Sequence, residues 1–140
     1  MRKRILKLFL FICSLLVVST SAEGTDWMLI TKSKDGNQSI FIDKESIRRT
    51  SRFADKDIIR VWGKIVYKEP EPYNSKYISY SLKHYEWYCD EKSLRIIQLL
   101  HYYTDGTNEP EFDPKLRQWN KVESDTIEDV IYKYLCDKDK

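Results

Sequence analysis

Two long segments in the middle of the chain alternate in side-chain character with a period of two, which is typical of antiparallel strands with one solvated face. In Asp57–Tyr67 one parity is apolar and the other is mixed. Gly63 lies on the apolar parity and indicates a bulge or a close approach of another group. Tyr77–Cys89 is a long aromatic strand whose apolar face switches near His84, which predicts a bend or bulge.

Turn signals place further strands on either side of these two segments. We expect Trp27–Asp43 to form one hairpin and Tyr77–Thr104 to form a second, each around a polar turn. The Lys68–Pro72 segment is expected to stop its strand, because proline cannot donate to a ladder. Asp105–Pro110 reads as a polar loop, and Gln118–Val122 as a last short strand.

The C-terminal segment predicts one amphipathic helix. From Ile127 to Leu135 the apolar residues follow the i, i+3, i+4, i+7, i+8 spacing of a single buried stripe. Ser124 or Asp125 is expected to cap its N-terminus. The fold class is therefore α+β, an antiparallel sheet with one C-terminal helix packed on one face.

The N-terminus has the three-part order of a secretory signal peptide. Four cations in Met1–Lys7 precede the apolar run Leu8–Val18, and small residues follow up to Ala22. A run of eleven apolar residues is shorter than the roughly 20 that a membrane-spanning helix needs. We therefore expect cleavage after Ala22, with residues 1–22 as signal peptide and 23–140 as one exported domain without a membrane span. An uncleaved N-terminal anchor is the alternative.

The composition of the predicted mature domain excludes several functions. Without the four cations of the signal, 20 basic residues face 22 acidic ones, a net charge of −2. This is not the basic footprint of a nucleic-acid-binding protein. The whole chain has only four glycines and no phosphate-cradling loop. We find no catalytic motif and expect neither an enzyme nor a bound cofactor.

Two cysteines remain in the mature domain, Cys89 and Cys136. An even pair in an oxidising compartment is expected to form a disulfide, which stabilises by about 4 kcal/mol in the chain-entropy model. Cys136 falls almost opposite the apolar stripe of the helix, so the bridge is expected where the helix ends. A catalytic thiol or a two-cysteine metal site is the alternative.

His84 and His101 lie on consecutive strands of the second predicted hairpin and are expected to be near each other. They form either an ordinary cross-strand pair or a metal, small-ligand or pH-sensing site. Arg48, Arg49 and Arg52 form a small basic cluster, which is either a solvated loop or an anionic-ligand site.

Tyrosine is in excess, with ten residues, and aromatic side chains fall on both faces of the Tyr77–Cys89 strand. Most of them are explained by core packing. The face that looks away from the helix is either covered by a second chain or is an exposed contact surface. The candidate interface residues are Tyr77, Tyr80, Tyr85 and Trp87.

The order of these features resembles the surface-adhesin protein E family of proteobacteria. The residues that carry the resemblance are Trp27, Ile40-Phe41-Ile42-Asp43-Lys44-Glu45-Ser46-Ile47, Val61-Trp62, the Tyr80–Cys89 strand, Trp119-x-x-Val122 and a helix ending in Cys136. The resemblance implies a sheet of about six antiparallel strands, a Cys89–Cys136 bridge and a non-enzymatic binding protein.

The resemblance also implies partners and a location. The founding adhesin of the family looks like a surface lipoprotein that binds host matrix proteins such as vitronectin and laminin and can dimerise. This chain lacks a lipoprotein cysteine, since Phe11-Ile12 precede Cys13. We therefore expect an exported protein, periplasmic or at the cell surface, that binds a host matrix protein or an envelope protein. The alternatives are a periplasmic structural or accessory domain without a host ligand, and a small-ligand or metal binder that uses His84 and His101.

Overall fold

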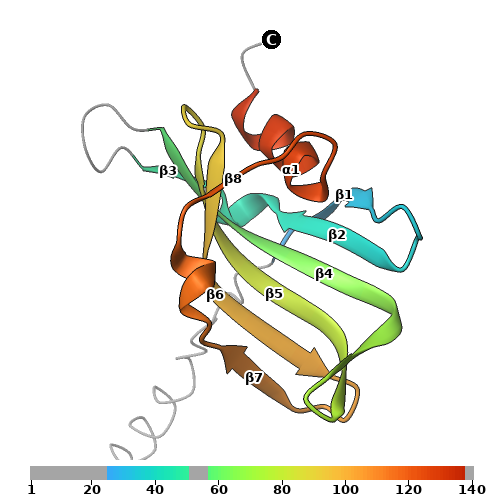
Figure 1. Cartoon of the computed structure of the whole chain (residues 1–140). Coiled ribbons are helices and arrows are strands. Elements are labelled where there is room, and N and C mark those ends of the chain that lie inside the picture. The colour runs from blue at the N-terminus through green and yellow to red at the C-terminus, as the bar shows by residue number, and fades with distance from the viewer. Residues whose placement is uncertain (1–24, 51–56, 138–140) are drawn as a thin grey trace, which may run out of the picture.

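The computed structural model of the protein describes residues 25–50 and 57–137 (Figure 1). The predicted signal peptide, the predicted cleavage point after Ala22, and Arg52 of the basic cluster lie outside these residues.

The described elements are strands followed by one C-terminal α-helix, with two short 3-10 turns between them. They are β1 (Trp27–Lys32), β2 (Gln38–Asp43), η1 (Lys44–Ser46), β3 (Arg48–Thr50), β4 (Ile58–Tyr73), β5 (Lys76–Tyr88), β6 (Ser93–Tyr103), β7 (Asn108–Glu111), η2 (Pro114–Arg117), β8 (Asn120–Lys121) and α1 (Ile127–Cys136).

All eight strands belong to one antiparallel sheet with the order β1-β2-β4-β5-β6-β7, while β3 pairs with β4 and β8 pairs with β6. Figure 1 shows a strongly curved sheet with α1 beside the end that carries β1 and β2. Hairpins join β1 to β2, β4 to β5, β5 to β6 and β6 to β7, so each of these strands lies beside its neighbour in sequence. This confirms the predicted fold class, with six strands on the main path and two short strands added at its margin.

One strand runs through a segment that was expected to end it. β4 continues past Pro70 and Pro72, and pairs with β5 again from Glu71 onward after a register shift that follows Val66. Pro70 lies in the interrupted part of the ladder and Pro72 pairs with Tyr77 beyond it. Pairing of β4 with β2 ends at Tyr67, so β4 is an edge at both prolines and a missing N–H is tolerated there. The strand then reverses through Asn74 and the residue after it, both with positive φ, a geometry typical of a tight two-residue hairpin.

Two smaller expectations also need correction, and one short strand was not predicted. The last part of the predicted loop Asp105–Pro110 forms the edge strand β7. The segment after η1 forms β3, which sequence alternation did not indicate. The helix cap is neither Ser124 nor Asp125 but Thr126, whose hydroxyl accepts a hydrogen bond of 3.1 Å from the backbone N–H of Asp129.

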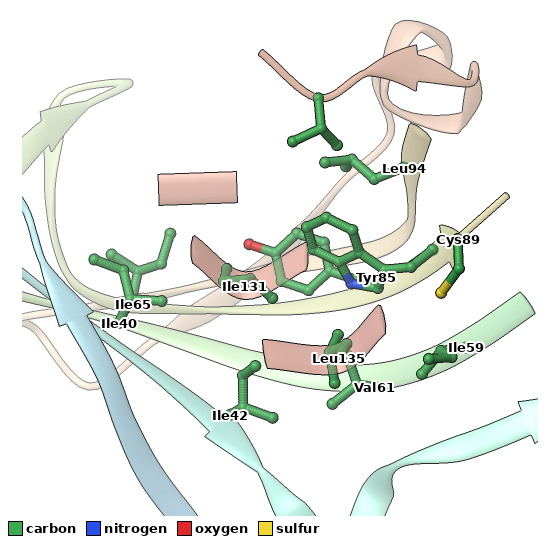
Figure 2. Packing of buried hydrophobic residues seen from close by; sticks show 12 residues of the cluster. Ile40, Ile42, Ile59, Val61, Ile65, Tyr85, Cys89, Leu94, Ile131 and Leu135 are labelled. Carbon is green, nitrogen blue, oxygen red and sulfur yellow. The ribbon is translucent and has the colours of Figure 1, made fainter. Parts of the chain in front are cut away.

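The core lies between α1 and the sheet face beside it, which we call the inner face. Apolar side chains from β2, β4, β5 and β6 meet two buried residues of the helix, Ile131 and Leu135 (Figure 2). Trp87 is the largest fully buried side chain. The members of this cluster are Ile40, Ile42, Ile59, Val61, Ile65, Tyr85, Trp87, Cys89, Leu94, Val122, Ile131 and Leu135.

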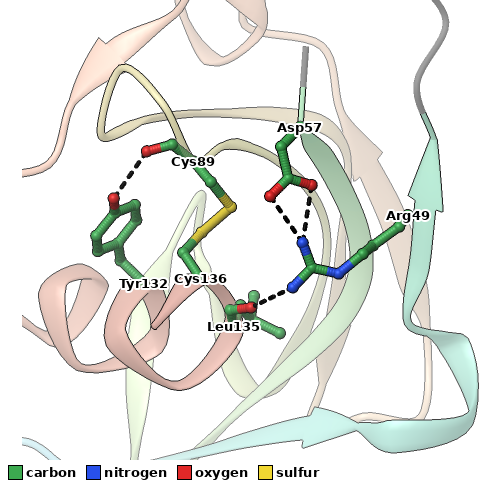
Figure 3. The surroundings of a disulfide bond; sticks show 6 residues. All are labelled: Arg49, Asp57, Cys89, Tyr132, Leu135 and Cys136. Carbon is green, nitrogen blue, oxygen red and sulfur yellow. Dashed lines mark hydrogen bonds and ion pairs between the residues drawn. A yellow bond between two sulfur atoms is a disulfide. The ribbon is translucent and has the colours of Figure 1, made fainter. Parts of the chain in front are cut away.

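A covalent bond and two polar contacts fasten the C-terminal end of α1 to the sheet (Figure 3). Cys89 and Cys136 form a disulfide, and Cys136 is the last residue of the helix, as predicted. The Tyr132 hydroxyl donates to the carbonyl of Cys89 at 2.7 Å. Arg49 pairs with Asp57 at 2.7 Å and donates to the carbonyl of Leu135 at 3.2 Å. Arg49 therefore links β3 to the residue that precedes β4 and to the end of the helix.

Candidate functional site: the outer face of the sheet

The sheet face opposite α1, which we call the outer face, is defined by the strand register. Residues of one parity on β4, β5 and β6 stand side by side there, because side chains alternate between the two faces of a sheet. Four cross-strand rows make up this face: Arg60–Glu86–Arg95, Trp62–His84–Gln98, Lys64–Leu82–Leu100 and Val66–Tyr80–Tyr102. Apart from Glu86, these side chains are half-buried or exposed.

Aromatic rings on the outer face stack in cross-strand pairs. Trp62 lies on His84 with ring centroids 4.5 Å apart and planes inclined by 10°. Tyr80 lies on Tyr102 with the same centroid separation and an angle of 11°. The ammonium group of Lys64 is 4.5 Å from the centroid of the Tyr80 ring. These pairs preorganise a rigid surface, since each ring is held by its neighbour rather than free to rotate.

A buried carboxylate organises the positive charge at one end of this face. Glu86 is 2% exposed and accepts hydrogen bonds from Arg60 at 2.6 Å and from Arg95 at 2.7 Å. Burial on its own would raise the pKa of Glu86, but the two guanidinium groups outweigh it and the pKa lies below its usual range. The Arg95 guanidinium also lies 4.7 Å from the centroid of the exposed Trp119 ring.

The outer face therefore has a net positive charge. Arg60, Lys64 and Arg95 supply three cations against the one carboxylate of Glu86. Burial, together with the nearby charge of Arg60, lowers the pKa of His84, so the imidazole is neutral at pH 7 and adds no further charge.

Two of the four candidate interface residues are buried, which corrects that prediction for them. Tyr85 is 4% exposed and Trp87 is fully buried, and both belong to the core under α1. Tyr85 and Trp87 share the parity of Ser81 along β5, which alternates without a break against β4 and turns both side chains to the inner face. The other two remain accessible: Tyr80 is half-buried on the outer face, and Tyr77 is 56% exposed near the start of β5.

The predicted proximity of the two histidines is wrong. His84 pairs with Gln98, whereas His101 pairs with Ser81. Because positions 81 and 84 have opposite parity along a regular stretch of β5, the two imidazoles lie on opposite faces of the sheet. They do not form one metal or ligand site.

His101 instead takes part in a hydrogen-bonded chain that links three strands. Ser81 Oγ lies 2.8 Å from His101 Nδ1, and His101 Nε2 lies 2.7 Å from Glu111 Oε2. A Ser-His-Glu sequence of contacts suggests acid–base chemistry, but Ser81 has no exposed surface and a substrate cannot reach it. This chain ties β5, β6 and β7 together.

Neither a metal centre nor a membrane span emerges from the described part of the chain. Residues 25–50 and 57–137 contain no group of three or more His, Cys, Asp or Glu side chains arranged to hold a metal ion. None of the helices in these ranges is long and apolar enough to cross a bilayer.

Sequence reasoning missed the residues that dominate the outer face, namely Trp62, Lys64, Tyr102 and Arg95. A signal for the first two was present in the mixed parity of Asp57–Tyr67, where a tryptophan and a lysine alternate with the core positions. Tyr102 and Arg95 lie on β6. Which β6 residues point to the outer face depends on the register shift between β5 and β6 beside His84, which the sequence of β6 alone does not reveal.

Together these features define a small disulfide-bonded sheet domain with one face closed by a helix and the other open, aromatic and cationic. Residues 27–137 match the family described as surface-adhesin protein E, and the chain belongs to that family. No curated protein and no solved structure matches the chain.

Proposed function

We propose that this protein is an exported, non-enzymatic adhesin domain that binds a protein partner through its outer face. The observation that carries the proposal is the preorganised row of aromatic rings and cations on the face opposite α1. Membership of the surface-adhesin protein E family supports binding as the function. Host matrix proteins are the proposed partners, as the family resemblance implies.

Charge distribution supports a partner with an acidic segment. The domain from residue 23 onward has a net charge of −2, yet the central part of the outer face holds three cations against one carboxylate. A positive patch on an acidic domain steers negatively charged partners to one face and raises the association rate. Half-buried tyrosine and tryptophan rings beside arginine are the side chains that most often dominate binding energy at interfaces.

The location of the protein is tested by protease treatment of intact cells, with an antibody against the domain and a periplasmic protein as control. We expect the domain to be lost while the periplasmic control survives. Survival of both, with release only after the outer membrane is permeabilised, would contradict surface display. That result would favour the alternative of a periplasmic accessory domain.

Binding itself is tested with purified protein and immobilised vitronectin and laminin. We expect saturable binding that weakens as ionic strength rises, because exposed charges are screened by salt. Binding that does not saturate, or that is equal on albumin, would overturn the adhesin proposal.

A further inference from the structure

A pocket of about 570 Å³ opens at the end of the outer face where β2, η1 and β3 meet β4. Its volume falls within the range of small-molecule sites. It lies apart from the Tyr80–Tyr102 stack but shares Arg60, Trp62 and His84 with the outer face. Its lining is Thr25, Asp43, Glu45, Ser46, Arg48, Arg60, Trp62 and His84.

Two arginines are paired across strands at this pocket. Arg48 of β3 stands directly opposite Arg60 of β4 in the register. Like charges in that position destabilise a sheet unless something compensates them. Glu86 compensates Arg60 from the other side, through the Nε atom, at 2.6 Å. Arg48 donates only to backbone carbonyls, those of Glu45 at 2.7 Å and Ile47 at 2.9 Å, among the hydrogen bonds of the described residues. A ligand carboxylate between the two guanidinium groups would complete the arrangement.

The rest of the lining adds an aromatic wall and acceptors. Trp62 and His84 line the pocket as a stacked pair, and stacking fixes the position of both rings. Glu45 is exposed and offers carboxylate oxygens. Asp43 is 7% exposed, and its Oδ1 atom accepts from the backbone N–H groups of Asp26 at 3.0 Å and Glu45 at 3.1 Å.

We propose that this pocket binds a sugar acid, a pyranose ring that carries a carboxylate. The carboxylate pairs with Arg48 and Arg60, whose planar donors match it. The C–H face of the ring packs on the Trp62–His84 wall, and the ring hydroxyls donate to Glu45 and Asp43. A neutral sugar would leave the arginines without a partner, and a bare carboxylate would leave the aromatic wall uncovered.

The test is a ligand-observed saturation-transfer NMR titration of protein purified from cells that express the full chain. The probes are glucuronate, glucose, which lacks the carboxylate, and acetate, which lacks the ring. We expect glucuronate to bind about tenfold more tightly than either, since each loses one of the two kinds of contact. Equal binding of glucose or of acetate, or no binding of glucuronate, would overturn the proposal.

Variants assign the binding to the pocket. Arg48→Gln removes an exposed guanidinium, and we expect it to weaken glucuronate binding about tenfold. Trp62→Leu should weaken binding of glucuronate without creating a preference for acetate. The matched control is Arg117→Gln, which removes an exposed arginine from η2, away from the pocket. Thermal melting confirms that each variant folds. Unchanged glucuronate binding in Arg48→Gln, or an equal loss in Arg117→Gln, would refute the assignment.

Discussion

At the scale of single residues, Gly63 shows how closely the core packs against β4. A Cβ atom added to this residue would meet the Cε2 atom of the Tyr85 ring at 2.6 Å. The register between β4 and β5 is regular on both sides of Gly63, so the glycine serves close approach and not a bulge. We expect Gly63→Ala to lower the free energy of unfolding by about 1–3 kcal/mol, because the buried ring must move.

Chemical denaturation measures this loss, and a second background controls it. In a Tyr85→Leu background the ring is gone, and the penalty of Gly63→Ala should become much smaller. An equal penalty in both backgrounds would show that the contact with Tyr85 is not its cause.

Asp129 is a second residue whose contribution to stability can be tested by a single substitution. Its carboxylate is 1% exposed and pairs with Lys133 at 2.8 Å and Lys92 at 2.9 Å. The hydrogen bond from Lys133, followed by that from Lys92, lowers the pKa of Asp129 below its usual range. A lowered pKa in the folded state gives stability above the unfolded pKa of about 4, and this stability is lost as the pH falls further.

We therefore expect Asp129→Asn to lower the melting temperature at neutral pH, with a difference from wild type that shrinks below about pH 4. Thermal melts from pH 7 to pH 3 measure this, with the exposed Asp90→Asn as the matched control. A difference that stays constant over this range would show that the charge of Asp129 is not what stabilises the fold.

At the scale of elements, the disulfide between α1 and the end of β5 is the main constraint on the helix. Its ends are 47 residues apart in the sequence, which corresponds to about 4 kcal/mol in the chain-entropy model. We expect Cys136→Ser to lower the melting temperature by about 10 °C or more under non-reducing conditions. A reductant should lower the melting temperature of wild type and leave that of the variant unchanged. An unchanged melting temperature in Cys136→Ser would contradict the account.

The elements that were predictable are those with long-range repetition in the sequence. Alternation located β4 and β5, turn signals located β6, and the apolar stripe located α1. The register shift beside His84 lies in the β5–β6 pairing, with its extra residue in β6 rather than in β5. The edge strands β3 and β7 were missed because they are three and four residues long and their pairing depends on a neighbouring strand already being in place. The predicted helix cap lay one or two residues before the observed cap, Thr126, which is the usual spread in where helix ends are assigned.

At the scale of the whole molecule, the sequence predicted two sheet faces but not which residues share them. The pairing of β5 with β6 brings His84 opposite Gln98 and His101 opposite Ser81, while the unbroken alternation of β5 against β4 turns Tyr85 and Trp87 to the inner face. Faces of a sheet depend on register, and register is set by pairing between strands. The candidate site could therefore be foreseen as aromatic, while the places of Arg95 and Tyr102 on it required the structure.

The outer face is the proposed binding surface, and one charge reversal tests this role most directly. Lys64 lies over the Tyr80 ring in the centre of this face, whereas Lys115 is exposed on η2. Binding to immobilised vitronectin and laminin is measured for Lys64→Glu and for the matched control Lys115→Glu, which changes the net charge equally. We expect the affinity to fall about tenfold or more for Lys64→Glu and to change little for the control. Equal affinities for the two variants would contradict it.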